Sequence, residues 1–303
     1  MKTERIVLDQ SRGVVLHAYL NHWTSATFGG YPKRGAVIVC PGGAFMVHAG
    51  SEGEPVAMAF AGAGYQTFLL RYGLGRHAVM PSPIVDAALA VACLRDHAEE
   101  WSIDPDKIAL CGFSAGGYVA SALGTMYNQA EIQELAGRTA EEIRPNALIL
   151  GYPLTLVEPL ENKITKLLSG NRVEPERFAR YSPVNNVGPH TPPTFLWNIF
   201  EDTMIPVETG LAFCAALAAS DVPFELHTFQ SGSHGCGLGT PVTSLGSASL
   251  EDDQVAHWFE LCCQWLANQF GPPQLPPDAV IGFEMPTGRR AHLGENNIPE
   301  SLE

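Results

Sequence analysis

Residues 108–117 read IALCGFSAGG, and their order indicates a strand, a sharp turn and a helix. A short apolar run over 108–111 is followed directly by Gly112-x-Ser114-x-Gly116, and small residues typical of a closely packed helix come next. In a strand–turn–helix of this kind the serine occupies a sharp, strained turn, and glycine on either side prevents clashes with neighbouring elements. A purely structural glycine turn is the alternative, but the strand before it and the helix after it favour Ser114 as a nucleophile.

Apolar runs and helical segments alternate along the rest of the chain. We expect strands over 36–40, 66–72, 108–111, 147–152, 194–198 and 224–229, and helices over 54–63, 81–101, 207–219 and 252–270, with one more starting at Ser114. Such alternation is typical of the α/β class, with a mostly parallel central sheet flanked by helices on both faces. Combined with the serine turn, it predicts an α/β-hydrolase fold.

The chain has 303 residues, and we expect a single α/β-hydrolase domain over residues 1–270. Residues 156–190 interrupt the alternation with a polar, proline-containing run. We interpret them as a short insertion over the sheet, a lid or pocket wall, rather than as a second domain. Residues 271–303 are rich in proline, glycine and charge, which predicts a C-terminal tail or an arm that packs on a neighbour. A homo-oligomer is therefore left open.

The composition, with 46% hydrophobic and 17% charged residues, is that of a soluble globular protein. The formal net charge of −14 repels phosphate backbones and anionic membrane surfaces. We therefore expect neither a nucleic-acid partner nor a membrane partner. A small neutral substrate is compatible with this charge.

The N-terminus and the cysteines indicate a reducing compartment. No apolar h-region follows the charged N-terminus, and no apolar stretch is long enough to span a membrane, so we expect a cytoplasmic protein. The seven cysteines form no Cys-x-x-Cys pair. Buried free thiols are therefore expected rather than disulfides or a metal site.

A glycine-rich turn, PGGAF at 41–45, follows the strand over 36–40. Such a turn lets backbone N–H groups point into a site without obstruction by side chains. In an acyl-transfer enzyme these donors would stabilise the oxyanion of the tetrahedral intermediate. We assign the N–H groups of Gly43 and Ala44, joined by that of Ala115, to this oxyanion hole. An ordinary glycine turn is the alternative, and its place one βαβ unit ahead of the serine turn argues against it.

The α/β-hydrolase fold places its acid after a late strand and its histidine after the last one. Asp202 lies in the loop between the strand over 194–198 and the helix over 207–219, and it is the expected acid. Glu201 is the competing carboxylate. A helix-capping or turn aspartate is the alternative role for Asp202.

His234 is the expected base, because it lies in a glycine-flanked loop directly after the last strand, over 224–229. Its separation from Asp202 leaves room for one helix and one strand, as the fold requires. His227 lies within that last strand, alternates with Glu225, and is expected to face solvent. The other candidates lie beyond the oxyanion turn, in the insertion and in the last helix: His48, His190 and His257.

Together these residues predict a serine esterase mechanism. His234 would take the proton of Ser114, whose oxygen would attack an ester carbonyl to form an acyl-enzyme. Water would then hydrolyse this intermediate with His234 again as the base, while Asp202 orients the imidazole and supports its positive charge. This chemistry needs no metal ion and no organic cofactor.

Further segments share a character with one group of proteins. They are PGGAF at 41–45, EGEPVA at 52–57, WSIDPDKI at 101–108 leading into CGFSAGG at 111–117, TPPTFLW at 191–197, VPFELH at 222–227 and SHG at 233–235. In this order they resemble the bacterial acetyl-xylan-esterase-like carbohydrate esterases of the α/β-hydrolase superfamily. The similarity runs from about residue 34 to residue 270.

The resemblance implies that the family's nucleophile, acid and base fall on Ser114, Asp202 and His234. It also implies the removal of acetyl groups from xylan-derived or related sugars, usually inside the cell. Two departures bear on the acyl acceptor rather than on the chemistry. Ala44 replaces the third glycine of the usual oxyanion turn and adds a methyl group, and Ser51 replaces the usual arginine before the Glu-x-Glu-Pro segment.

The leading hypothesis is a serine carboxylesterase that removes small acyl groups, acetyl above all, from acylated saccharides such as xylo-oligosaccharides through an acyl-enzyme on Ser114. A peptidase or amidase on the same scaffold is the first alternative, and the sequence offers no propeller or large cap that would select a peptide. A non-catalytic binding protein is the second alternative. Such proteins usually carry a degraded set of catalytic residues, whereas all three are present here.

Overall fold

The computed structural model describes residues 1–21, 33–155 and 175–271. The predicted lid over 156–190 is described only from residue 175 onward. There it forms the short helix α7 (Pro175–Tyr181) and the 3₁₀ turn η4 (Pro183–Asn186), which packs on two helices of the domain. The rest of the predicted insertion, 156–174, and the tail from residue 272 lie outside the described residues, so the roles expected for them stay predictions.

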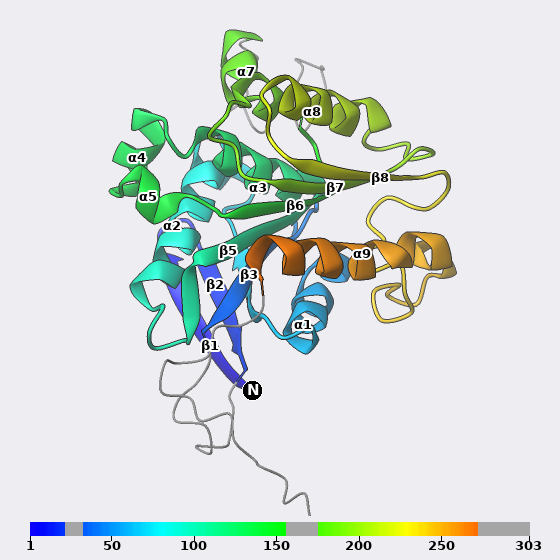
Figure 1. Ribbon diagram of the computed structural model, residues 1–303, viewed down its shortest axis with the longest axis horizontal. Helices are drawn as coiled ribbons and strands as arrows, with labels where there is room; N and C mark the ends of the chain where they lie inside the picture. Colours follow the sequence, from blue (N-terminus) through cyan, green and yellow to red (C-terminus); the bar gives the residue numbers. More distant parts are fainter. Residues whose placement is uncertain (22–32, 156–174, 272–303) are drawn as a thin grey trace, which may run out of the picture.

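One eight-stranded sheet forms the centre of the molecule, in the order β1-β2-β4-β3-β5-β6-β7-β8 (Figure 1). The strands are β1 (Lys2–Asp9), β2 (Val14–Leu20), β3 (Arg34–Cys40), β4 (Gln66–Arg71), β5 (Ile103–Phe113), β6 (Ala147–Gly151), β7 (Thr194–Ile199) and β8 (Phe224–Phe229). The six strands from β4 to β8 are parallel, whereas β1 and β2 join as an antiparallel hairpin on the β4 side. The predicted mostly parallel sheet is confirmed.

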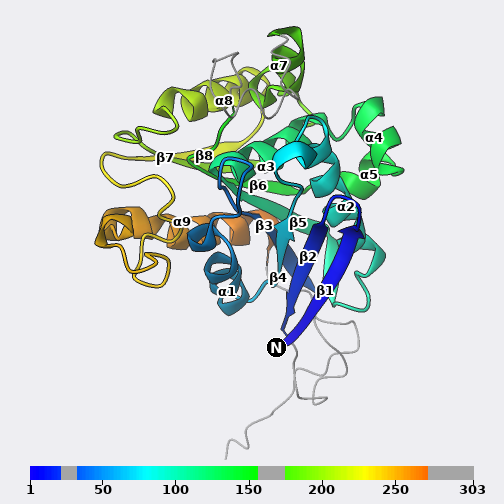
Figure 2. The same ribbon diagram turned by 180° about the vertical axis from the view of Figure 1, so that it is seen from behind.

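Helices cover both faces of this sheet, as Figures 1 and 2 show from opposite sides. They are α1 (Glu54–Gly62), α2 (Ser82–Asp96), α3 (Ser114–Met126), α4 (Ala130–Ala136), α5 (Ala140–Ile143), α7, α8 (Val207–Ala219) and α9 (Asp253–Phe270). One hydrophobic core lies between the sheet and α2, α3 and α8, and a second lies between the sheet and α1 and α9. The fold is therefore a three-layer α/β arrangement.

Strand β5 is buried on both faces and carries the serine turn at its end. Ile108 and Leu110 belong to the core under α2, α3 and α8, whereas Ala109, Cys111 and Phe113 belong to the core under α1 and α9. This is the period-two alternation of a strand with both faces covered, which explains its continuous apolar sequence.

The long helix expected over 81–101 ends earlier, at Asp96, and β5 begins earlier than expected, at Ile103. The chain reverses between them, with Ser102 at φ +53°. Trp101, which fits the apolar stripe of a longer helix, instead packs its buried ring against Phe68 and stacks on His97. Trp101 is therefore buried by a tertiary contact of the turn and does not continue helix α2.

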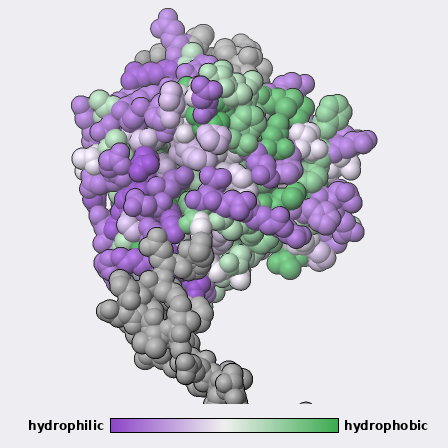
Figure 3. All heavy atoms as spheres, viewed as in Figure 1, coloured by the Kyte–Doolittle hydropathy of each residue, from purple (hydrophilic) through white to green (hydrophobic). Residues whose placement is uncertain are grey.

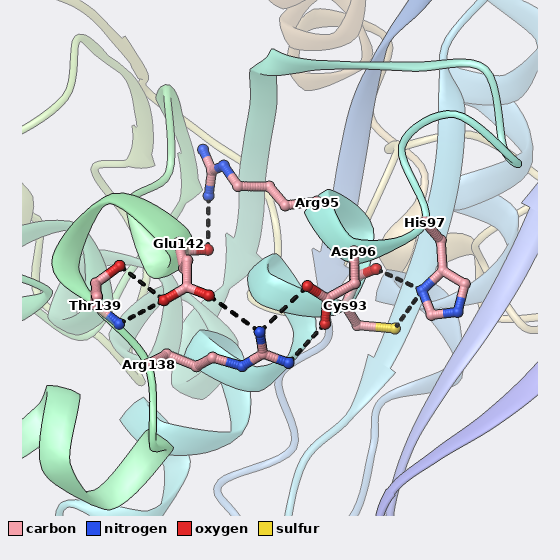
Figure 4. A network of polar contacts seen from close by, with 7 residues as sticks. All are labelled: Cys93, Arg95, Asp96, His97, Arg138, Thr139 and Glu142. Atoms are coloured by element: carbon pink, nitrogen blue, oxygen red, sulfur yellow. Dashed lines mark hydrogen bonds and ion pairs between the residues drawn. The ribbon is translucent and has the colours of Figure 1, made fainter.

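A polar network ties α5 to the C-terminal end of α2 (Figure 4). The Arg95 guanidinium donates to the carbonyl oxygens of Glu142 and Arg144, at 2.9 and 2.7 Å, and to Asn146 Oδ1 at 3.2 Å. Burial lowers the pKa of Arg95 to about 10. Arg138 adds an outer layer to the network by bridging the carboxylates of α2 and α5. These contacts anchor the connection that leads into β6.

Candidate active site

Ser114 begins α3 directly after β5, at φ +51°. A non-glycine residue in this left-handed region is strained and persists only when its surroundings hold it there. A methyl group on Gly112 would lie 2.2 Å from the carbonyl oxygen of Gly116, and one on Gly116 would lie 1.9 Å from that of Cys40. Both glycines are therefore required, and the strained turn that the sequence predicts is present.

His234 lies between Ser114 and Asp202. Its Nε2 is 2.8 Å from Ser114 Oγ, and its Nδ1 is 2.6 Å from Asp202 Oδ2. Because a carboxylate only accepts hydrogen bonds, Nδ1 carries the proton and the Nε2 lone pair faces the serine hydroxyl. The three residues predicted from the sequence thus come together from the β5–α3 turn, the loop after β7 and the loop after β8.

Asp202 is held by backbone amides as well as by the imidazole. Its Oδ1 accepts the N–H groups of Met204 at 2.8 Å and Ile205 at 3.0 Å. Burial raises the pKa of Asp202, but the hydrogen bond and charge of His234 and the two amides outweigh this effect, so the pKa is lowered below its ordinary 3.8. The side chain is therefore a carboxylate at neutral pH.

The competing residues do not reach the serine. Glu201 is exposed, and the imidazole Nε2 of His48 is hydrogen-bonded to the carbonyl oxygen of Tyr72. His227 was expected to face solvent, but it is half-buried, because its ring packs on Phe195 while its Nε2 pairs with the carboxylate of its strand neighbour. The two remaining histidines lie against the end of α3 and on the exposed side of α9: His190 and His257.

The predicted oxyanion turn has three successive residues with positive φ: Gly43 at +116°, Ala44 at +54° and Phe45 at +59°. The buried Phe45 ring packs between two tyrosines and anchors the turn. The Gly43 carbonyl accepts the amides of Met46 and Val47. Within the described residues, no protein acceptor takes the N–H of Gly43 or Ala44.

Sheet register brings this turn against the serine. Cys40 at the end of β3 pairs with Gly112 in β5, so the residues that follow these two positions lie side by side. A methyl group on Gly42 would lie 2.8 Å from the Cβ of Ser114. The turn and the N-terminus of α3, which carries Ala115, therefore border the same space beside the serine hydroxyl.

Glu52 and Tyr152 form part of the site, although sequence reasoning assigned neither of them a role. Tyr152 follows β6, donates its hydroxyl to Glu52 Oε1 at 2.8 Å, and accepts the N–H of Gly237 at 3.1 Å. Its ring centroid is 4.7 Å from that of His234. The segment containing Glu52 was recognised only by resemblance, and a single glutamate in a polar stretch carries no signal of burial.

The loop that carries His234 is fixed at two neighbouring positions. Ser51 Oγ donates to the carbonyl oxygen of Gly235 at 2.7 Å, and the indole of Trp258 donates to that of Gly237 at 3.0 Å. Gly237 has φ +60°, and a methyl group there would lie 2.2 Å from the Ser51 carbonyl oxygen. Ser51 is thus a bridge to the histidine loop.

The described part of the chain shows neither a cluster of three or more side chains suited to hold a metal ion nor a helix able to cross a membrane. All seven cysteines are free thiols, six of them buried.

The surface over the late strands is apolar in part, as the green patches on the right half of Figure 3 show. Exposed apolar side chains lie on three loops of the site, those after β3, β7 and β8: Met46, Val47, Phe200, Met204, Val242 and Leu245.

A serine on a strained strand-to-helix turn, at the centre of an eight-stranded and mostly parallel sheet, defines the α/β-hydrolase fold. The chain belongs to the BD-FAE family, whose profile matches residues 30–217. It is 32% identical over 213 residues to endo-1,4-beta-xylanase B of Butyrivibrio fibrisolvens and 30% identical over 216 residues to an acetylxylan esterase of Xylanibacter ruminicola. The resemblance seen in the sequence is confirmed.

These relatives are longer proteins. The aligned segments span 67% of this chain but 32% of the xylanase, and 69% of this chain but 42% of the acetylxylan esterase. Among solved structures, MGS-M1, an α/β-hydrolase enzyme from a Medee basin deep-sea metagenome library, matches with a TM-score of 0.73 and 34% identity. That match covers 89% of this chain and 98% of MGS-M1, so it extends over the whole fold.

Proposed function

We propose that this protein is a serine carboxylesterase that removes small acyl groups, acetyl above all, from acylated saccharides such as xylo-oligosaccharides. The observation that carries the proposal is the continuous hydrogen-bonded line from Ser114 through His234 to Asp202 at a strained turn. The glycine-rich turn borders the serine, and the N–H groups of Gly43 and Ala44 have no acceptor among the protein groups that the structure describes. This is the set of groups that acyl transfer requires.

In the proposed reaction, His234 Nε2 accepts the hydroxyl proton as Ser114 Oγ attacks the ester carbonyl carbon. The carbonyl oxygen becomes an oxyanion that accepts hydrogen bonds from the oxyanion-hole amides: those of Gly43, Ala44 and Ala115. The imidazolium then gives its proton to the leaving alcohol oxygen, and the acyl-enzyme remains. A water molecule loses its proton to His234 and attacks the acyl carbon. The imidazolium then gives that proton to Ser114 Oγ as the acyl C–O bond breaks, which releases the carboxylic acid and the free serine.

The charge and surface of the protein support a small neutral substrate. The net charge of −14 disfavours polyanionic substrates, and the apolar side chains on the three site loops face solvent without adding charge. The names of the two relatives, a xylanase and an acetylxylan esterase, favour an acetylated xylan fragment as the substrate. We further propose that residues 1–270 form one domain, since the described strands share one sheet.

The test compares hydrolysis of p-nitrophenyl acetate, butyrate and longer acyl esters by the wild type and by Ser114→Ala. We expect acetate to be the preferred acyl group and the variant to be inactive. Equal rates for the two proteins would overturn the proposed mechanism, and a preference for chains longer than butyrate would overturn the acetyl specificity. Release of acetate from acetylated xylo-oligosaccharides, followed by mass spectrometry, then tests the sugar.

A further inference from the structure

Glu52 is a buried carboxyl group at the end of the 3₁₀ turn η2 (Gly50–Glu52), with an exposed fraction of 1%. Its Oε2 accepts the N–H of Gly42 at 2.6 Å, and its Oε1 accepts the hydroxyl of Tyr152 at 2.8 Å. Both partners are neutral donors. A buried carboxyl group costs free energy unless it is hydrogen-bonded, and both oxygens of Glu52 are bonded here, so removing the carboxyl group would leave two buried donors without their acceptor.

The two partners of Glu52 belong to different parts of the site, the oxyanion turn and the residue that follows β6. Gly42 directly precedes the proposed oxyanion donors and would touch Ser114 through any added methyl group. Tyr152 contacts the His234 ring and holds the amide of Gly237 in the histidine loop. Glu52 therefore hydrogen-bonds the oxyanion turn to Tyr152 and, through Tyr152, to the histidine loop, which Ser51 also contacts at Gly235.

We propose that Glu52 is a positioning residue, which fixes the oxyanion turn relative to His234 and whose negative charge supports the imidazolium formed during the reaction. The inference rests on the proposed esterase function and assigns a role to a residue outside the Ser114–His234–Asp202 line. It acts through Gly42 and Tyr152 and does not touch the reacting atoms.

The electrostatic surroundings agree with this role. Burial raises the pKa of Glu52, while the hydrogen bonds from Tyr152 and Gly42 and the charge of His234 lower it, and burial has the largest effect. The other titratable groups near Glu52 stay neutral at neutral pH, because burial raises the pKa of each: Cys40, Tyr72, Cys111, Tyr152 and Cys236. Among the described residues, Asp202 and Glu52 are carboxyl groups that interact electrostatically with His234.

The experiment compares Glu52→Gln with Glu54→Gln, which changes the exposed glutamate of the same Glu-Gly-Glu segment. Glutamine offers one acceptor oxygen and an NH₂ group that cannot accept, so one of the two hydrogen bonds is lost. For Glu52→Gln we expect kcat for p-nitrophenyl acetate to fall about tenfold or more, with KM changed by less than about threefold, as for a loss confined to the transition state. Glu54→Gln is expected to match the wild type.

The pH profile separates positioning from general stability. With the negative charge removed, the imidazolium loses electrostatic support, so the acid limb of kcat/KM is expected to move to lower pH in Glu52→Gln. Tyr152→Phe keeps the ring and the carboxylate but removes one hydrogen bond, and we expect it to lower kcat in the same direction. If Glu52→Gln does not fold, the kcat of Tyr152→Phe tests the inference instead.

Unchanged kcat and an unchanged acid limb in Glu52→Gln would overturn the inference, as would a wild-type kcat in Tyr152→Phe. An equal loss in Glu54→Gln would also overturn it, because the effect would then not belong to the buried position. Failure of the proposed function is distinguishable from these results. It would appear as full activity in Ser114→Ala, whereas failure of this inference leaves that variant inactive.

Discussion

The Nδ1 of His234 lies 2.6 Å from Oδ2 of Asp202, and the carboxylate is otherwise held by two backbone amides. This contact selects the imidazole tautomer whose Nε2 faces the serine. In Asp202→Asn the side chain can present an NH₂ group to Nδ1 and favour the wrong tautomer. We expect kcat to fall by on the order of 10³–10⁴-fold, with little change in KM.

Glu201→Gln is the matched control for this prediction, because Glu201 is adjacent in sequence but exposed. Steady-state kinetics with p-nitrophenyl acetate should give wild-type kcat for it. A severe loss in Glu201→Gln together with an active Asp202→Asn would reassign the acid.

The backbone around the serine turn leaves no room for a methyl group at Gly116, whose added Cβ would lie 1.9 Å from the Cys40 carbonyl oxygen. Gly116→Ala is therefore expected to lower the free energy of unfolding by about 3 kcal/mol or more, because the backbone of β3 must move. Gly62→Ala is the control, because no atom lies within 4 Å of a methyl group added at this position. Gly62 is the last residue of helix α1. This substitution should stabilise the protein by about 0.5–1 kcal/mol in urea unfolding.

Arg95 and Arg138 belong to the same network but differ in burial. Arg95 is half-buried and satisfies two carbonyl oxygens at the α5–β6 connection, whereas Arg138 pairs with exposed carboxylates. Arg95→Met should lower the free energy of unfolding by about 1–3 kcal/mol, because buried carbonyl groups lose their donor. Arg138→Met should cost about 0–1 kcal/mol. Equal losses in the two variants would contradict this ranking, and esterase activity at 25 °C should survive in both.

Asp86 on α2 is fully buried, accepts the N–H of Gly73 at 2.9 Å, and lies 2.5 Å from Nη2 of Arg12 in the β1–β2 turn. Burial raises its pKa from 3.8 to about 6 despite the arginine. The folded state therefore binds the proton more tightly than the unfolded state, and the contribution of Asp86 to stability falls as pH rises through this window.

Asp86→Asn removes this titration. The free energy of unfolding of the wild type, measured relative to that of Asp86→Asn, should decrease by about 1–3 kcal/mol as the pH rises from about 4 to about 7. Urea unfolding at several pH values checks it. A difference that stays constant or grows with pH would show that the folded-state pKa is not raised.

Much of the sheet could be predicted because its central strands are apolar on both faces. The apolar runs over 36–40 and 108–111 predict most of β3 and the inner part of β5, and the turns after them are predicted from the glycine-rich residues that follow each run. The hairpin of β1 and β2 was missed. β1 alternates exposed and half-buried residues over KTERIVLD at the sheet edge, so it lacks the continuous apolar signal of the inner strands.

The candidate site divides in the same way. Ser114, Asp202 and His234 could be assigned because each occupies a loop that the fold reserves for it, although their catalytic roles stay predictions. Glu52 and Tyr152 could not be assigned, because their importance comes from burial and from contacts across loops that are distant in the chain. No periodic pattern in the sequence predicts a hydrogen bond between two side chains that are distant in the chain.

The proposed mechanism requires an acyl-enzyme on Ser114, and mass spectrometry can detect this intermediate on the protein itself. The protein is mixed with p-nitrophenyl acetate, quenched in acid within the first turnovers, and digested to locate any added mass. We expect one acetyl group on the peptide that contains Ser114, and none on that peptide in Ser114→Ala. An acetyl group on another residue, or rapid ester hydrolysis by Ser114→Ala, would contradict the account.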